Sequence, residues 1–182
     1  MKLENANLVV ITGGPGAGKT TVLRELEQRG FGCVPEVARQ IIQEQVRACG
    51  DAVPWANADR YCRLRLERSI ASYRENHPAY TVTFCDRGIP DTLCAARLLR
   101  LPWESEVLAA CEEYRYGTRV FLAPPWREIY ETDAERKQTY DEAVRTYELL
   151  ASIYRNCGYE VVEIPKVSPG LRAEFIVEQA AG

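Results

Sequence analysis

A glycine-rich segment at residues 13–20 constrains the fold of this chain more than any other feature. It reads Gly-Gly-Pro-Gly-Ala-Gly-Lys-Thr and matches the pattern G-x-x-x-x-G-K-[ST], the phosphate-binding P-loop. Residues 8–11 are apolar and mostly β-branched, which is typical of a buried parallel strand. Residues 20–29 follow the helical period, with Val22, Leu23 and Leu26 on one face. The sequence therefore predicts a strand, a glycine loop and a helix in succession, as the motif requires.

The chemistry of this segment is directed at phosphate. Glycines let the backbone curl so that successive N–H groups point at a phosphate chain, and the following helix adds its positive dipole end. Lys19 is placed to reach the β- and γ-phosphates of a nucleotide, and the hydroxyl of Thr20 is placed to bind Mg²⁺. The residues expected to bind the nucleotide are Gly13, Gly14, Pro15, Gly16, Ala17, Gly18, Lys19, Thr20 and Thr21.

Predicted strands and helices alternate along the rest of the chain. Four further strands are predicted at 31–34, 80–85, 119–122 and 159–164. Helices are predicted at 35–48, 59–76 with Asp59 as its cap, 91–99, 105–114, from 140 to the terminating Gly158, and 168–177. This order predicts an α/β fold: one domain spanning residues 1–182, with a five-stranded parallel sheet between two layers of helices. Ligands of such sheets bind at the carboxyl ends of the strands.

The composition of the chain argues against nucleic acid and membranes as binding partners. With 182 residues, a net charge of −3 and a pI near 5.4, the chain has no general attraction to nucleic acid or anionic membranes. No apolar stretch approaches the roughly 20 residues of a membrane span, and residues 1–7 do not resemble a signal peptide. The seven cysteines include no C-x-x-C pair, which argues against zinc. We therefore expect a cytoplasmic protein, with homo-oligomerisation left open.

An acidic and a basic residue follow the predicted third strand. Asp86 ends the apolar run Val-Thr-Phe-Cys, and an apolar strand ending in Asp is the pattern that holds Mg²⁺ opposite a P-loop threonine. Arg87 can neutralise phosphate or clamp a substrate group. The alternatives are a helix cap for Asp86, and for Arg87 an ion pair that orients Asp86 or Glu36.

The predicted second strand leads to another candidate pair. Glu36 follows it directly, where a carboxylate could accept a proton from a substrate hydroxyl or hold that hydroxyl by hydrogen bonding. Arg39 lies three residues further on the same helical face and could also contact substrate. The alternative for Glu36 is an acidic residue that only complements the helix dipole.

Four other residues are interpreted as structural. Asp91 is expected to cap the helix that follows it, with substrate contact as the minority view. The only histidine, His77, precedes a proline at a predicted helix end and reads as a surface cap. Trp55 and Trp103 lie beyond strand ends, and we favour packing over an aromatic wall for a substrate ring.

A charged segment separates the fourth strand from its helix. Residues 124–138 occupy the place where kinases of this architecture carry a mobile lid, which supplies arginines to the transferred phosphoryl group and excludes water. Arg127 and Arg136 are the best candidates, and Lys137 is a weaker one. The alternative is a solvated helix face with surface ion pairs.

Taken together, the motifs resemble a known group: the small predicted P-loop ATPases related to the kinase domain of nicotinamide riboside kinases. The resemblance spans nearly the whole chain and rests on segments 13–20, 35–39 (Pro-Glu-Val-Ala-Arg), 86–91 (Asp-Arg-Gly-Ile-Pro-Asp) and 124–136. It implies a sheet order of 2-3-1-4-5, Glu36 as the base, and Asp86 with Arg87 as the metal- and substrate-binding pair. No Asn-Lys-x-Asp guanine-binding segment is present, so ATP is the expected nucleotide and GTP the alternative.

Three functions compete at this point. The first is a kinase that transfers the γ-phosphoryl group of ATP, with Mg²⁺, to a hydroxyl or phosphate of a nucleoside-like or other small molecule. The second is a nucleotide-hydrolysing switch that acts through a protein or lipid partner. The third, a nucleic-acid-processing ATPase, is disfavoured by the acidic balance and the lack of a basic stripe.

Overall fold

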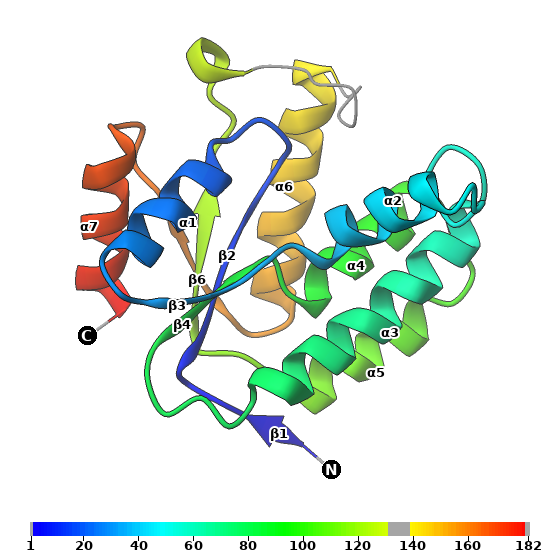
Figure 1. The fold of residues 1–182 in the computed structure, drawn as a ribbon, viewed down its shortest axis with the longest axis horizontal. Coiled ribbons are helices and arrows are strands. Elements are labelled where there is room, and N and C mark those ends of the chain that lie inside the picture. The colour runs from blue at the N-terminus through cyan, green and yellow to red at the C-terminus, as the bar shows by residue number, and fades with distance from the viewer. Residues whose placement is uncertain (1, 131–138, 181–182) are drawn as a thin grey trace.

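A central parallel sheet organises the fold. The computed structural model describes residues 2–130 and 139–180, and Figure 1 shows their arrangement. Within them, five strands pair in the order β3–β4–β2–β6–β7. Their bounds are Gly32–Val34, Thr83–Asp86, Leu8–Gly13, Arg119–Ala123 and Glu160–Glu163. Numbered along the chain among these five, the order is 2-3-1-4-5, which confirms the α/β fold class and the predicted order.

The two faces of the sheet are covered by different helices (Figure 1). Alternate residues of β2 point to opposite faces, so Val9 and Ile11 pack with α1 (Lys19–Gln28) and α7 (Pro169–Ala180). Leu8 and Val10 pack on the other side with the remaining helices. The residues of β2 are all buried, because a sheet covered on both faces has no solvent side.

The second face carries most of the helices. They are α2 (Val37–Arg47), α3 (Ala58–Asn76), α4 (Ile89–Leu98), α5 (Glu104–Glu113) and α6 (Tyr140–Asn156). As predicted, Gly158 follows the end of α6 with a positive φ of 81°. No helix in the described part of the chain is both long enough and apolar enough to cross a membrane.

Two local details differ from the sequence prediction. The cap of α3 is Asn57, whose side chain accepts from the Arg60 N–H, and Asp59 lies inside the first turn. The carboxylate of Asp59 instead accepts from the Trp103 indole at 2.6 Å. A short parallel pair, β1 (Leu3–Glu4) with β5 (Tyr114–Arg115), was also not predicted. Strands of two residues are too short to show a periodic pattern.

The register of the sheet brings the candidate residues to one edge. Ile11 of β2 lies opposite Asp86 of β4, and Gly13 lies opposite Ala123 of β6. Val34 of β3 pairs with the residue before Asp86, so the connection into α2 emerges beside the glycine-rich loop. Three loops with charged or phosphate-directed residues therefore meet at the carboxyl ends of adjacent strands.

Candidate active site

The glycine-rich loop has a backbone that only small residues allow. Gly13, Gly16 and Gly18 have positive φ angles of 146°, 71° and 74°. A Cβ atom on Gly13 would lie 2.6 Å from the carbonyl oxygen of Ala123 on the neighbouring strand. The loop thus depends on glycine both for its left-handed turns and for close packing on β6.

Lys19 lies across this loop at the start of α1. Its ammonium donates hydrogen bonds to the carbonyl oxygens of Gly13 at 3.1 Å and Gly14 at 2.9 Å, and the side chain is buried. The hydroxyl of Thr21 donates to Gly18 at 2.7 Å and lies in an exposed position, while Thr20 is partly buried. The cation is therefore held inside the curve of the loop, where it can meet the phosphates of a nucleotide.

Asp86 has the environment of a metal ligand. One carboxylate oxygen, Oδ1, is buried and has no hydrogen-bond partner in the described part of the chain. Burial raises the pKa of this carboxyl, and the charge of Lys19 acts in the opposite direction. An unsatisfied buried carboxylate oxygen is costly, and a divalent cation would satisfy it. The Asp86 carboxylate thus fits a divalent cation.

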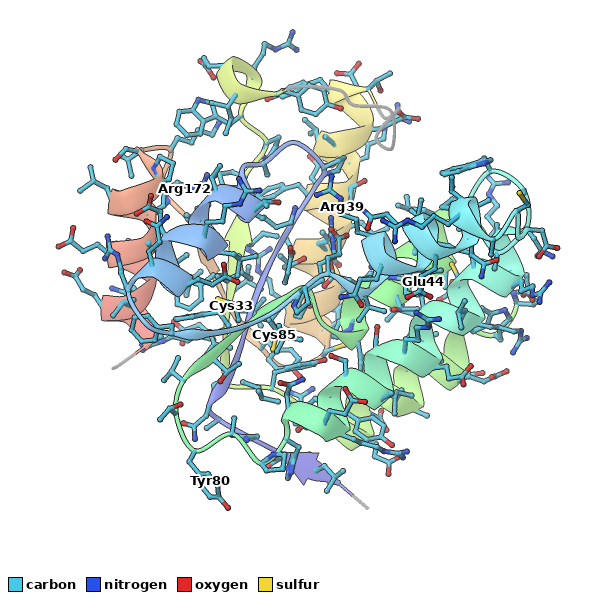
Figure 2. The ribbon with its side chains drawn as sticks, in the orientation of Figure 1. Cys33, Arg39, Glu44, Tyr80, Cys85 and Arg172 are labelled. Atoms are coloured by element: carbon cyan, nitrogen blue, oxygen red, sulfur yellow. The ribbon has the colours of Figure 1, made fainter. Side chains whose placement is uncertain are left out.

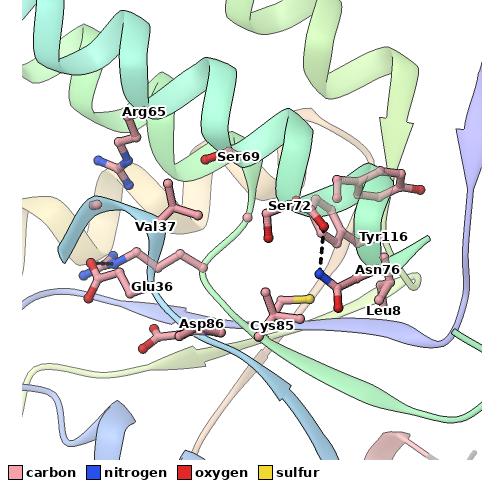
Figure 3. Close-up of a pocket in the computed structure, with 16 residues that line it drawn as sticks. Leu8, Glu36, Val37, Arg65, Ser69, Ser72, Asn76, Cys85, Asp86 and Tyr116 are labelled. Carbon is pink, nitrogen blue, oxygen red and sulfur yellow. Dashed lines mark hydrogen bonds and ion pairs between the residues drawn. The ribbon is translucent and has the colours of Figure 1, made fainter. Parts of the chain in front are cut away.

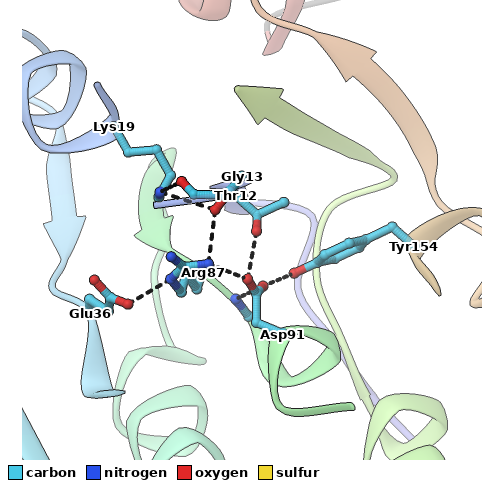
Figure 4. A network of polar contacts seen from close by, with 9 residues as sticks. Thr12, Gly13, Lys19, Glu36, Arg87, Asp91 and Tyr154 are labelled. Carbon is cyan, nitrogen blue, oxygen red and sulfur yellow. Dashed lines mark hydrogen bonds and ion pairs between the residues drawn. The ribbon is translucent and has the colours of Figure 1, made fainter. Parts of the chain in front are cut away.

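Glu36 and Arg87 form an ion pair next to the loop (Figure 4). The Nε of Arg87 donates to the Glu36 carboxylate at 2.6 Å, and Nη1 donates to the Gly13 carbonyl oxygen at 3.0 Å. Burial by itself raises the pKa of Glu36. The positive charges of Arg87, Lys19 and Arg65 outweigh burial and lower that pKa from 4.5 to about 2. Glu36 is therefore a carboxylate at neutral pH, linked through Arg87 to the P-loop.

Asp91 is the centre of a buried network that sequence reasoning missed. Its carboxylate accepts from the hydroxyls of Thr12 and Tyr154, both at 2.6 Å, from Nη1 of Arg87 at 2.9 Å and from the Gly88 N–H at 3.0 Å (Figure 4). The last bond helps to cap α4, but the N-cap residue is Gly88, and Asp91 lies inside the first turn instead of preceding the helix as predicted. Thr12 and Tyr154 fix the Asp91 carboxylate, which in turn holds the guanidinium of Arg87. The φ of Arg87, 72°, lies in the left-handed region that residues other than glycine rarely adopt.

A cavity of about 610 Å³ opens beside the Glu36–Arg87 pair. It lies between the glycine-rich loop, α2, α3, α4 and α6, and its size is typical of a small-molecule site. Polar side chains line it at Glu36, Arg39, Arg65, Arg87, Asp91, Glu142 and Thr146. Figure 2 shows Arg39 between α2 and the loop. A second cavity of about 30 Å³, drawn in Figure 3, shares Glu36, Arg65 and Arg87.

Comparison with family models decides the family. A model described as an AAA domain matches residues 8–172. The chain belongs to the AAA domain family. The match starts at the first residue of β2 and ends in α7. It therefore includes the P-loop, Asp86 and the Glu36–Arg87 pair of this AAA domain.

Individual relatives match a segment of this chain or its fold. A nucleotide-binding protein of Sorangium cellulosum, sce5766, is 48% identical over 42 residues, which are 23% of this chain and 12% of that protein. The NadR protein in complex with NR has a TM-score of 0.69 at 19% identity, covering 95% of this chain and 51% of that one. Deoxyadenosine kinase from M. mycoides has a TM-score of 0.62 at 11% identity. The match covers 96% of this chain and 98% of that one. This AAA domain therefore has the fold of P-loop kinases and spans about half of the NadR chain.

The predicted lid lies only partly within the described residues. Arg136 and Lys137 fall outside them. Arg127 begins the short 3-10 helix η1 (Arg127–Ile129), is exposed, and places its guanidinium 4.4 Å from the ring centre of Tyr140. The end of this stretch does reach the P-loop, because a Cβ on Gly16 would lie 2.7 Å from the Tyr130 ring.

Two of the residues interpreted as structural, Trp103 and His77, have structural positions, and a third, Trp55, does not. Trp103 is buried and packs under the Arg63 guanidinium, as predicted. His77 follows the last residue of α3 as its C-cap. The packing role predicted for Trp55 is wrong: its side chain is 63% exposed and lines the large cavity. Its neighbours Pro54 and Asn57 favour a loop there, and nothing in the sequence shows which way that loop faces.

A further arginine that was not predicted from the sequence contacts the glycine-rich loop from α7. Arg172 of α7 is buried, and its Nη2 donates to the carbonyl oxygen of Ala17 at 3.0 Å. Its guanidinium lies 6.0 Å from the ring centre of Trp126, and Figure 2 shows it directed at α1. The signal in the sequence is weak, because an arginine within an ordinary surface helix is common.

Proposed function

We propose that this chain is an ATP-dependent small-molecule kinase whose 182 residues act as one catalytic domain. The γ-phosphoryl group would pass from the glycine-rich loop to a hydroxyl or phosphate of an acceptor in the 610 Å³ cavity. The observation that carries the proposal is the position of the Glu36–Arg87 pair. Arg87 bonds to the P-loop backbone at Gly13, and both side chains of the pair line the cavity. A separate acceptor site joined to the phosphate site is what a kinase needs.

Each polar group then has a role in the transfer. The loop and Lys19 bind the β- and γ-phosphates, and Arg87 neutralises charge between donor and acceptor. Mg²⁺, held by Thr20 and Asp86, would supply further charge neutralisation on the phosphates. With a pKa of about 2, Glu36 is a weak base, so it orients the acceptor hydroxyl and takes its proton only late in the transfer.

The lid and the nucleotide are part of the same proposal. Arg127, Arg136 and Lys137 would approach the phosphates when the segment 124–138 closes, while Arg39 and Arg87 contact the acceptor. ATP is preferred because the chain lacks the guanine-binding segment Asn-Lys-x-Asp. Such small-molecule chemistry needs neither nucleic acid nor a membrane.

The variant Glu36→Gln tests this assignment. We expect it to lower the transfer rate about 100-fold or more while ATP·Mg²⁺ affinity stays unchanged, because Glu36 contacts the acceptor and not the nucleotide. The measurement is phosphorylated product by mass spectrometry, across a panel of nucleosides, nucleotides and hydroxy acids. Lys19→Met should instead lose nucleotide binding. Glu44→Gln is the matched control, because Glu44 lies on α2 in an exposed ion pair with Arg68 of α3. Full activity of Glu36→Gln with every accepted substrate would refute the role of Glu36.

A nucleotide-dependent switch is the second candidate, and one contact favours it. Ile129 and Tyr130 lie against Gly18 and Gly16 of the P-loop, so nucleotide in the loop would displace them or fix their position. The same assay separates the two functions. Nucleotide consumption that rises with a protein or lipid partner, without a phosphorylated small molecule, identifies a switch.

A further inference from the structure

Arg65 has an unusual position among the arginines of α3. The other four have partners: Arg60 with Asp51 at 2.6 Å, Arg63 with Asp59 at 3.1 Å, Arg68 with Glu44 at 2.6 Å, and Arg74 with the Tyr114 hydroxyl. Arg65 is partly buried and has no hydrogen bond or ion pair with any residue that the structure describes. It lines the 610 Å³ cavity, and Figure 3 shows its guanidinium directed from α3 toward Glu36.

The acidic groups nearest to Arg65 are already bound to another cation. Arg87 donates to Glu36 at 2.6 Å and to Asp91 at 2.9 Å. Arg65 lowers the pKa of both carboxyls through space, so it lies close enough to act on them without contacting either. The charges of Glu36, Asp91 and Arg87 sum to −1, and both carboxylates have Arg87 as their ion-pair partner. A guanidinium with five donors therefore faces the cavity with no acceptor of its own.

The walls around Arg65 are largely apolar. Tyr61 lies one turn before it on α3, and Ile42, Trp55 and Leu98 face the same space from other segments. A planar guanidinium at an apolar wall matches a carboxylate or phosphate in a bidentate manner, and the low polarity of the wall strengthens that contact.

From this arrangement we infer that the acceptor is an anion: a small molecule whose carboxylate or phosphate is bound by Arg65 and whose apolar part lies against Tyr61 and Trp55. The inference rests on the proposed kinase function and names its substrate class. The acceptor spans the cavity, with its reacting oxygen at Glu36 and its anionic group at Arg65. Neutral nucleosides bring no negative charge to the Arg65 guanidinium and are disfavoured.

Three small probes test this directly: benzoate, phenyl phosphate and the neutral isostere benzamide. Each is titrated into the full chain while the indole N–H of Trp55 is followed by NMR. The P-loop is first saturated with Mg²⁺ and a non-hydrolysable ATP analogue. Phenyl phosphate then cannot bind at that loop and be mistaken for a ligand of the cavity. We expect at least one anion to bind about tenfold or more tightly than benzamide. The preference between benzoate and phenyl phosphate shows which anion the site takes.

Variants of α3 then assign the effect to one side chain. Arg65→Gln is expected to remove the tenfold preference for the anion, and Arg65→Lys to restore part of it. Arg68→Gln is the matched control, because it makes the same change one turn away at a residue paired with Glu44. Arg65 makes no hydrogen bond or ion pair with a described residue and acts on Glu36 and Asp91 only through space, so Arg65→Gln should keep the fold and lose only a little thermal stability.

The outcomes separate the two proposals. Equal binding of benzamide, survival of the preference in Arg65→Gln, or failure of both anions to bind overturns the anionic acceptor. Failure of the ATP analogue to bind in the first titration, or anion binding without transfer to any anionic acceptor, counts against the kinase instead. A neutral acceptor that is phosphorylated equally by Arg65→Gln and the unmodified chain refutes the role of Arg65 alone.

Discussion

The ion pair at the active site makes a quantitative prediction about folding. Glutamine has the shape and lack of charge of a protonated glutamate, so Glu36→Gln removes what the charged form gains on folding. A fall in the pKa of Glu36 from 4.5 to about 2 corresponds to roughly 3 kcal/mol of stabilisation of its carboxylate. The side chain is 18% exposed, so solvent screens little of this interaction. We therefore expect Glu36→Gln to lower the free energy of unfolding at pH 7 by about 3 kcal/mol.

The pH dependence of this difference has a definite sign. The pKa of Glu36 is lower in the folded than in the unfolded chain, so its stabilisation is fully present above pH 4.5. It is lost as the pH falls through about 2, where folded and unfolded chains both hold the proton. The difference between the two proteins should therefore shrink continuously from about pH 4.5 downward, while it stays constant between pH 6 and 8.

Urea unfolding at a series of pH values measures this. Glu44→Gln is again the control: its ion pair with Arg68 is exposed, and we expect it to cost less than about 1 kcal/mol at any pH. Equal stability of Glu36→Gln and the unmodified chain at pH 7 would refute the reasoning. A 3 kcal/mol loss that persisted unchanged at pH 3 would also refute it, because the loss would then come from packing and not from charge.

Two further substitutions probe the neighbouring carboxylates. In the absence of ligand, Asp86→Asn should raise the free energy of unfolding by on the order of 1 kcal/mol. The pKa of Asp86 is raised in the folded chain, so its negative charge destabilises the fold once the pH exceeds that pKa. The same variant should lose the extra thermal stabilisation that Mg²⁺ gives with ATP; an Asp86→Asn protein that keeps it has its metal elsewhere. Tyr154→Phe removes one hydrogen bond to the buried Asp91 carboxylate and should cost about 2 kcal/mol in urea unfolding, and a cost below about 0.5 kcal/mol would show that Asp91 is satisfied without it.

Most of the fold could be predicted from the sequence because its signals are local. The strand, glycine loop and helix at residues 8–28 follow from apolar periodicity and from a motif with one known backbone shape. The alternation of strands and helices fixes a parallel sheet, whereas its order came only from the family resemblance. The cap of α3 was misplaced by two residues. Asn57 and Asp59 are both suitable caps, and the contact of Asp59 with the distant Trp103 indole could not be read from the sequence.

The site could be predicted only where the chain position determines geometry. Glu36, Asp86 and Arg87 were identified because residues after parallel strands meet at one edge. The alternative of an ion pair between Arg87 and Glu36 is confirmed, whereas the ion pair with Asp91 was not predicted, because Asp91 was interpreted only as a helix cap. Arg65 was missed for a different reason: five arginines of α3 look alike in sequence, and only the tertiary structure shows which one faces a cavity.

Three residues of the candidate site have features that destabilise the folded chain, and each of the three has a role in the proposed function. Arg87 has a strained backbone, Lys19 is a buried cation, and a buried oxygen of Asp86 has no partner in the described chain. Under the proposed function, the costs at Lys19 and Asp86 would fall on ligand binding, because phosphate oxygens would reach Lys19 and a divalent cation would reach Asp86. The Asp91 network is different: its four bonds are complete without ligand. It can therefore hold Arg87 in its strained conformation before substrate arrives, so that binding energy is available for the transferred phosphoryl group.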